Sequence, residues 1–137
     1  MTSRKQLVVV TIFAALACTG LHAQSPDMRA TIPFDFHAGD RLMPAGEYVI
    51  HGEGPAVLLR GADGRSPGVI FLTIRTESRD LSNTRLEFNR YGSEFFLSII
   101  WNSLTQSGRQ VLPTAREKEL AKQAAPVPAA VTLASSK

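Results

Sequence analysis

The chain has 137 residues, and its formal net charge of +3 overstates the charge of the part that is expected to fold. Of its 15 basic residues, Arg4 and Lys5 lie in an N-terminal leader, which leaves 13 basic residues against 12 acidic ones. Nucleic-acid binding needs a clustered excess of basic side chains to neutralise phosphates, so this nearly neutral chain is expected to have no nucleic-acid partner.

Residues 1–23 have the parts of a secretory signal peptide. The basic pair is followed by an apolar run at 7–16, and the segment ends in Ala23, the small residue that signal peptidase requires. The run is too short to span a membrane, which takes roughly 20 residues. We therefore expect cleavage after Ala23 and an exported product, periplasmic or secreted, that retains no transmembrane span.

Cys18 is the one cysteine of the chain, and it lies within the leader. Because the small residue Ala17 precedes it, a lipoprotein anchored at Cys18 is the alternative to cleavage after Ala23. Against this alternative, Leu16 stands one place closer to the cysteine than the leucine of such signals usually does. Without Cys18, the rest of the chain has no disulfide, thiol nucleophile or thiolate metal ligand.

After a short polar lead-in at 24–27, the sequence predicts a series of short β-strands. Apolar and polar residues alternate at 30–36, with Ile32, Phe34 and Phe36 on one face, and Pro33 marks this segment as an edge strand. Further strands, separated by turns that contain Gly or Pro, are expected at 47–51, 56–60, 69–74 and 110–112. The apolar run at 69–74 predicts a central strand that is buried on both faces.

The clearest local signal is a β-hairpin. Gly92 and Ser93 form a two-residue loop between the segments 85–91 and 94–102. Strand alternation places two sets of side chains on opposite faces of the second arm. One set is Phe95, Leu97, Ile99 and Trp101, and the other is Phe96, Ser98, Ile100 and Asn102.

A single helix is predicted near the C-terminus, because Thr114 and Glu117 fit a capping box and helix-forming residues continue to about Ala124. Residues 125–137 are rich in Ala, Val and Pro without periodicity, and are expected to be disordered. The expected organisation is a β-rich domain at 28–124 with a helix at about 115–124. The expected fold class is mostly β: a single sandwich or small barrel of about six to eight strands with that helix.

Four segments of the chain carry a family resemblance when taken in order. They are 32–36 (IPFDF), 42–49 (LMPAGEYV), 86–92 (LEFNRYG) with Phe95-Phe96-Leu97 and Trp101, and 116–121 (REKELA). The set resembles a family of uncharacterised bacterial exported proteins over about residues 29–122, although Met43 is inserted where that family usually runs Leu-Pro. The resemblance implies a small exported β-rich domain and assigns no catalytic or binding residue.

Several residue types could carry chemistry, but none forms a recognisable active-site pattern. His37 and His51 lack the paired spacing of metal ligands and are expected to be solvated at strand ends. Neither a nucleophile elbow nor a phosphate-binding glycine loop occurs. We therefore expect a protein that is not an enzyme and uses no cofactor or metal. A small hydrolase is the weaker alternative, and it would need a polar cleft with converging acidic or histidine side chains.

The aromatic residues supply the candidate ligand or partner surface. Tyr48, Tyr91, Phe96 and Trp101 could form a stacking platform, although aromatics at period-two spacing are also typical of a core. The expected function is a non-catalytic binding or structural role, with an envelope polymer or a protein as partner. A carbohydrate-binding module is the alternative. Specificity is expected in the loops at 39–46, 61–68 and 75–83, whereas the scattered arginines are interpreted as charges on solvated faces rather than as an anion site.

Overall fold

The computed structural model describes residues 27–65, 68–77 and 82–133, so the leader predicted at 1–23 lies outside the described residues. The described part contains ten strands and one helix. They are β1 (Met28–Ile32), β2 (Phe36–Ala38), β3 (Arg41–Met43), β4 (Gly46–Glu53), β5 (Ala56–Gly61), β6 (Val69–Thr76), β7 (Arg85–Tyr91), β8 (Glu94–Asn102), β9 (Ser107–Val111), α1 (Ala115–Gln123) and β10 (Val127–Thr132). The prediction of a mostly β fold with one C-terminal helix is confirmed, with more strands than the roughly six to eight expected.

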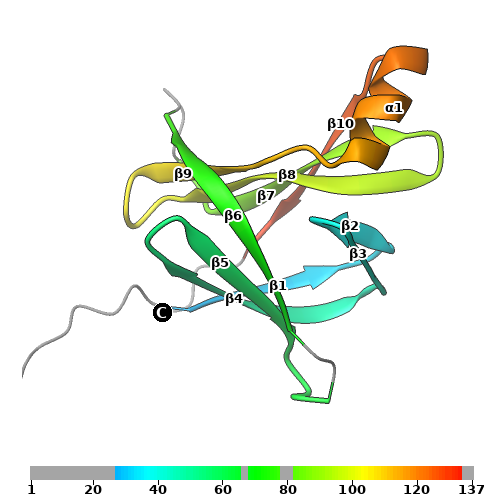
Figure 1. Cartoon of the computed structure of the whole chain (residues 1–137). Coiled ribbons are helices and arrows are strands. Elements are labelled where there is room, and N and C mark those ends of the chain that lie inside the picture. The colour runs from blue at the N-terminus through cyan, green and yellow to red at the C-terminus, as the bar shows by residue number, and fades with distance from the viewer. Residues whose placement is uncertain (1–26, 66–67, 78–81, 134–137) are drawn as a thin grey trace, which may run out of the picture.

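All ten strands belong to one sheet that folds over itself (Figure 1). Its order is β1-β4-β5-β6-β9-β8-β2-β3, with β7 added to β8 and β10 added to β7. Strand β6 joins the two halves, because residues 69–72 pair with β5 whereas residues 73–76 pair with β9. The outermost strands of the two halves, β1 and β10, also contact each other. The halves therefore face each other across a shared interior, as the layers of a β-sandwich do.

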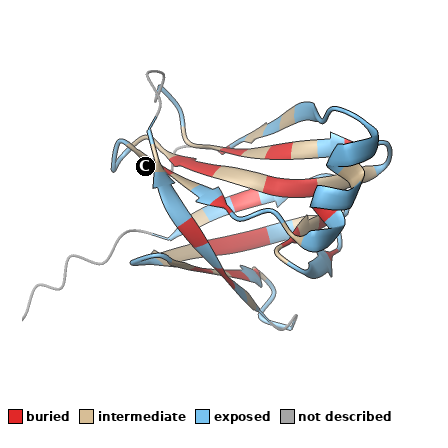
Figure 2. Cartoon of the chain, turned by 45° about the horizontal axis from the view of Figure 1, so that its top comes forward, coloured by how far each residue is buried: buried red, intermediate tan, exposed pale blue. Residues whose placement is uncertain are grey.

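The interior is a single apolar core between the two halves, and buried segments alternate with exposed ones along most strands (Figure 2). Its members include Ile32, Tyr48, Ile50, Val57, Leu59 and Phe71 from one half and Leu86, Phe88, Leu97, Ile100 and Val111 from the other. Phe36 on β2 is fully buried and meets the rings of both Tyr48 and Phe88 edge to face. Each side chain of this size stabilises the fold by about 1.5–3 kcal/mol when it is fully buried.

The strand predicted at 30–36 is divided into β1 and β2. Pro33 has no N–H to give to a ladder, and the Asp35 carboxylate accepts a hydrogen bond from Ala45 N at 2.9 Å instead of lying along a continuous strand. The predicted alternation is nevertheless confirmed in the burial, since Ile32 and Phe36 are buried whereas Pro33 and Asp35 are exposed. β1 is an edge strand, as Pro33 indicated, because it pairs with β4 alone.

Strand β6 is central in the sheet, as predicted, but the prediction that both of its faces are buried is wrong. Phe71 and Thr73 are buried, whereas Ile70, Leu72 and Ile74 are 69%, 61% and 50% exposed. An antiparallel sheet can leave one face in water. In the described part of the chain, no element covers the outer face of β6, so its apolar residues stay at the surface.

The hairpin of β7 and β8 has the predicted bounds, and Gly92 in its loop adopts the positive φ, 62°, that such a loop requires. The predicted division of the β8 side chains into two faces is wrong beyond Leu97. A β-bulge lies there, because Phe88 pairs with Leu97 and the preceding residue Glu87 pairs with Ile99. The extra residue shifts the alternation, so that Leu97 and Ile100 both reach the core.

The helix begins as predicted, with Thr114 Oγ1 accepting a hydrogen bond from Glu117 N at 3.2 Å. The tail beyond it was expected to be disordered, and here the structure differs, because residues 127–132 form β10 on the free edge of β7. Ala129 and Val131 pack against the core, and Leu133 is buried. The backbone donors and acceptors of the β7 edge pair with this segment, which contains the strand-forming residues Val127, Val131 and Thr132.

Candidate functional site

The four aromatic residues of the candidate surface are buried. Tyr48, Tyr91, Phe96 and Trp101 are 3%, 9%, 2% and 5% exposed, and of these only Tyr91 and Phe96 are in ring contact, at 5.8 Å. Tyr48 lies in the core between the two halves, and Trp101 packs on Gly108 of the neighbouring strand. Because stacking on a sugar requires an exposed ring, these four residues do not form the expected platform.

Burial also affects the chemistry of the two phenols. Burial raises the pKa of Tyr91 above its ordinary value, and the nearby Glu117 carboxylate raises it further. Burial likewise raises the pKa of Tyr48, with smaller contributions from Asp35 and Asp63. Tyr48 donates its hydroxyl hydrogen to Pro44 O at 2.5 Å. These surroundings favour the neutral form of both phenols.

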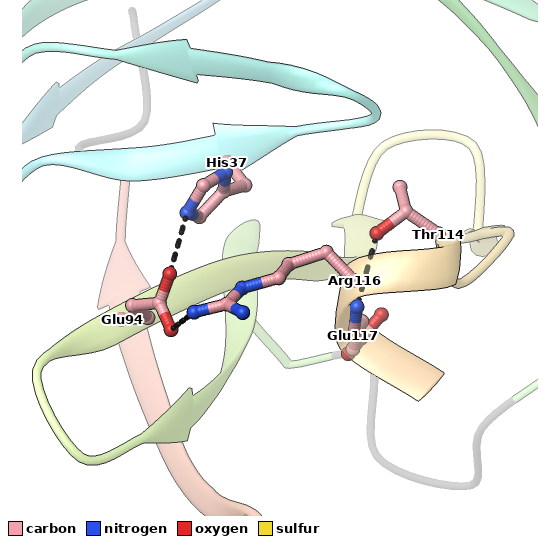
Figure 3. Close-up of polar contacts among 5 residues, drawn as sticks. All are labelled: His37, Glu94, Thr114, Arg116 and Glu117. Carbon is pink, nitrogen blue, oxygen red and sulfur yellow. Dashed lines mark hydrogen bonds and ion pairs between the residues drawn. The ribbon is translucent and has the colours of Figure 1, made fainter. Parts of the chain in front are cut away.

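A polar cluster joins β2, β8 and α1 (Figure 3). The Glu94 carboxylate lies 3.6 Å from His37 Nε2 and 3.0 Å from Arg116 Nη2. The His37 ring stacks on Phe96 at 4.4 Å, and the buried Glu117 accepts a hydrogen bond from the side chain of Asn89. Each of these polar groups faces a partner, so the cluster fastens the helix to the sheet.

The second histidine, His51, lies on β4 with its Nδ1 2.6 Å from Asp27 Oδ1. The pair is partly exposed and ties the start of β1 to its neighbouring strand. Within residues 27–65, 68–77 and 82–133, no group of three or more His, Cys, Asp or Glu side chains could hold a metal ion.

Strands β6 and β9 place two arginines directly opposite each other. Arg75 pairs in register with Arg109, so both side chains leave the same face of the sheet, with Cβ atoms about 5 Å apart. That face is the one that carries the buried Thr73 and Val111 two residues along each strand, but at this end of the sheet Arg75 is exposed and Arg109 is half-buried. The Arg109 guanidinium donates to Gly54 O in the turn between β4 and β5, and so reaches across to the other half of the sheet.

Two hollows adjoin this arginine pair, and Arg75, Ser107 and Arg109 line both of them. The larger has a volume of about 280 Å³ and is also lined by Gly54, Pro55, Thr73 and Gly108. The smaller has about 230 Å³ and is also lined by Met28, Ile50, Gly52, Ile100, Asn102 and Thr105. The β4–β5 and β8–β9 turns lie on the same side of the molecule (Figure 1). We call the region formed by these lining residues the arginine end.

Neither arginine has an acidic partner among the residues that the structure describes. None of the ion pairs there includes Arg75 or Arg109, and the neighbouring Glu53 and Glu77 carboxylates lie more than 4.0 Å from their guanidinium nitrogens. Guanidinium groups remain charged in proteins. Like charges directly opposite each other on neighbouring strands repel, and a bound anion would offset that repulsion.

The interpretation of the scattered arginines as charges on solvated faces did not predict this pair. Arg75 and Arg109 are far apart in the chain, and only the antiparallel pairing of β6 with β9 brings them together. The available signal was the excess of arginine over lysine after residue 23. The loop predicted at 75–83 did contain Arg75, but the structure places this residue on a strand.

A separate apolar groove of about 770 Å³ lies beside the first half of β6. The β2–β3 turn and the residues between β9 and α1 also contribute to it. Ile70, Leu72 and Leu112, which line the groove, are all about half exposed or more. Exposed apolar groups of this kind are typical of contact surfaces, and this one is independent of the arginine end.

The sequence matches no protein-family model, and no curated protein or solved structure matches the chain. In the described part of the chain, no helix is both long and apolar enough to cross a bilayer.

Proposed function

We propose that this protein is an exported, non-catalytic binding protein that recognises a negatively charged group at its arginine end. The observation that carries the proposal is the in-register pairing of Arg75 with Arg109 beside two hollows, with no carboxylate partner in the described residues. Arginine forks bind carboxylate, phosphate and sulfate oxygens through strong charge-assisted hydrogen bonds. Both an acidic polymer of the cell envelope and a small organic anion carry such oxygens.

Export is supported by the leader at 1–23 and by the resemblance to a family of bacterial exported proteins. A non-catalytic role is supported by the polar cluster around Glu94, whose charged groups fasten the helix to the sheet. A module that binds neutral sugars by stacking has less support, because Tyr48, Tyr91, Phe96 and Trp101 are buried.

Calorimetric titration of the exported chain at moderate salt, about 0.1 M sodium chloride, tests the binding proposal. The probes are inorganic phosphate, sulfate, acetate, an oligogalacturonate and the neutral sugar maltose. We expect at least one anion to bind and maltose not to bind. The substitution Arg75→Gln should weaken anion binding by roughly tenfold or more, because hydrogen bonds to charged groups contribute about 1.5–3 kcal/mol.

The matched control is Arg60→Gln, which removes the same charge from an exposed position on β5. Its affinity for anions should stay within about twofold of the parent, because screening at ~10 Å limits the reach of an exposed charge at moderate salt. If none of the anions binds, or if both substitutions weaken binding equally, the arginine end is not the binding site.

Export has a test of its own, the intact mass of the protein recovered from cells that express the full chain. We expect a product that begins at Gln24 in the exported fraction. A lipid-modified product that begins at Cys18 would instead support the anchored alternative. A cytosolic product that retains residues 1–23 would contradict export.

A further inference from the structure

The balance of hydrogen-bond donors and acceptors at the arginine end indicates which class of anion fits there. Asn102 Oδ1 accepts a hydrogen bond from Leu104 N at 2.9 Å and another from Thr105 N at 3.4 Å. Both lone pairs of that oxygen are therefore occupied. The part of the Asn102 side chain that can still bind a ligand is the Nδ2 amino group, which is a donor only.

Ser107 and Thr105 add a further donor. Their hydroxyl oxygens lie 2.7 Å apart, so one hydroxyl donates to the other and one O–H hydrogen remains for a different acceptor. Both residues line the smaller hollow, and among the described residues no carboxylate lines either hollow. Together with the N–H groups of Arg75 and Arg109, these side chains make a surface rich in donors and poor in acceptors.

We propose that the arginine end binds a doubly charged tetrahedral oxyanion, the terminal group of a phosphate monoester or an inorganic sulfate or phosphate, in preference to a carboxylate. This inference rests on the proposed anion binding and adds the class of ligand. Two guanidinium forks, an amide and a hydroxyl offer more donors than the two oxygens of a carboxylate can accept. A phosphoryl group presents three strong acceptor oxygens, and its charge near −2 balances the two arginines.

The size of the site agrees with this ligand class. A cavity of ~150 Å³ is enough to hold a molecule as large as benzene. The two hollows, at about 230 and 280 Å³, each have room for a tetrahedral oxyanion and for part of the group attached to it. The apolar side chains of Met28, Ile50 and Ile100 line the smaller hollow, so the attached group need not be charged.

The test is calorimetric titration with inorganic sulfate, inorganic phosphate, glycerol 3-phosphate and acetate, in a buffer without other oxyanions. We expect the tetrahedral dianions to bind at least tenfold more tightly than acetate. Arg75→Lys, which keeps the charge but loses the fork, should lose most of this preference. Vesicles of phosphatidylcholine with and without phosphatidic acid show whether the phosphate on a lipid surface is bound as well as the soluble ester.

Lowering the pH from 7.5 to 5.0 gives a second readout. Glycerol 3-phosphate should bind more weakly at the lower pH, because its second ionisation has a pKa of about 6, whereas sulfate stays doubly charged. The titratable groups next along the chain, His51 with Asp27, Glu53 and Glu77, would affect both ligands alike, so the sulfate titration controls for them.

The outcomes separate this inference from the proposed function. If acetate or galacturonate binds as tightly as sulfate and phosphate, and Arg75→Gln abolishes that binding, the proposed function stands and the preference for tetrahedral oxyanions is wrong. If no anion binds, or if Arg75→Gln leaves binding unchanged, both are wrong.

Discussion

The contact between Gly108 and Trp101 depends on the absence of a single methyl group. Trp101 pairs with Gly108 on the neighbouring strand, and a Cβ atom added at position 108 would clash with Trp101 Cζ3 and Cε3. The neighbouring ring is large and buried, so it cannot move aside without disturbing its own packing. The packing of Trp101 therefore requires glycine at position 108.

We expect Gly108→Ala to lower the free energy of unfolding by about 1–3 kcal/mol, the usual cost of overpacking. Urea unfolding followed by the fluorescence of Trp101, the one tryptophan in the chain, measures this. The control is Gly46→Ala, whose added Cβ would lie 3.9 Å from Tyr48 Cε2, an ordinary contact. Equal effects of the two substitutions would mean that the Trp101 contact is not responsible.

The two buried phenols make stability depend on pH in the alkaline range. Burial raises the pKa values of Tyr48 and Tyr91 above 10.0, so both remain neutral in the folded chain where they would ionise in the unfolded chain. Their contribution to stability should be complete below about pH 10 and should be lost as the pH rises through the folded pKa values. Absorbance titration of phenolate in the folded chain measures the two raised pKa values directly, because the chain has only these two tyrosines.

The variant Tyr91→Phe separates the two phenols in that titration. This variant should remove one of the two phenols that ionise above pH 10.0, and the pKa of the remaining Tyr48 should stay raised. A native-state titration centred at or below pH 10 for both residues would contradict the burial argument.

At the scale of elements, β6 shows how a strand can be central without being buried on both faces. An uninterrupted apolar run predicts a strand covered on both sides, as in parallel sheets. Here the outer side chains Ile70 and Leu72 remain exposed, and the inner side chain Phe71 reaches the core. The two faces of one strand should therefore respond very differently to truncation.

We expect Phe71→Ala to cost about 3–5 kcal/mol of stability, because it empties a core position. Leu72→Ala, at the adjacent exposed position, should change stability by less than about 0.5 kcal/mol. Thermal unfolding of the two variants under the same conditions makes the comparison. A large loss for Leu72→Ala would show that a second surface covers the outer face of β6, such as another copy of the chain.

For the molecule as a whole, the arginine pair is expected to lower the stability of the unliganded fold and to contribute to anion binding. Arg75 and Arg109 face each other across one ladder without a carboxylate partner in the described residues, and both belong to the proposed binding site. Residues that bind a ligand are often arranged at the expense of the stability of the unliganded fold. The same substitution that weakens anion binding should thus stabilise the empty protein.

We expect Arg75→Gln to raise the free energy of unfolding by about 0.2–1 kcal/mol at low salt, because it removes a like-charge cross-strand pair. The gain should shrink at high salt, since counterions screen the repulsion. Urea unfolding at low and at 1 M sodium chloride, without phosphate or sulfate, measures both effects. A loss of stability that is independent of salt would show that Arg75 contributes by packing rather than by charge.

Local chemistry was enough to predict the mostly β fold, the bounds of the β7–β8 hairpin and the start of α1. Each depends on residues close together in the chain: alternating side chains, Gly92 in a tight loop, and Thr114 capping Glu117 N. Tertiary structure decided the bulge in β8, the addition of β10 and the exposure of β6, because each depends on which strand lies alongside. It also decided the candidate site, since only the pairing of β6 with β9 brings Arg75 opposite Arg109.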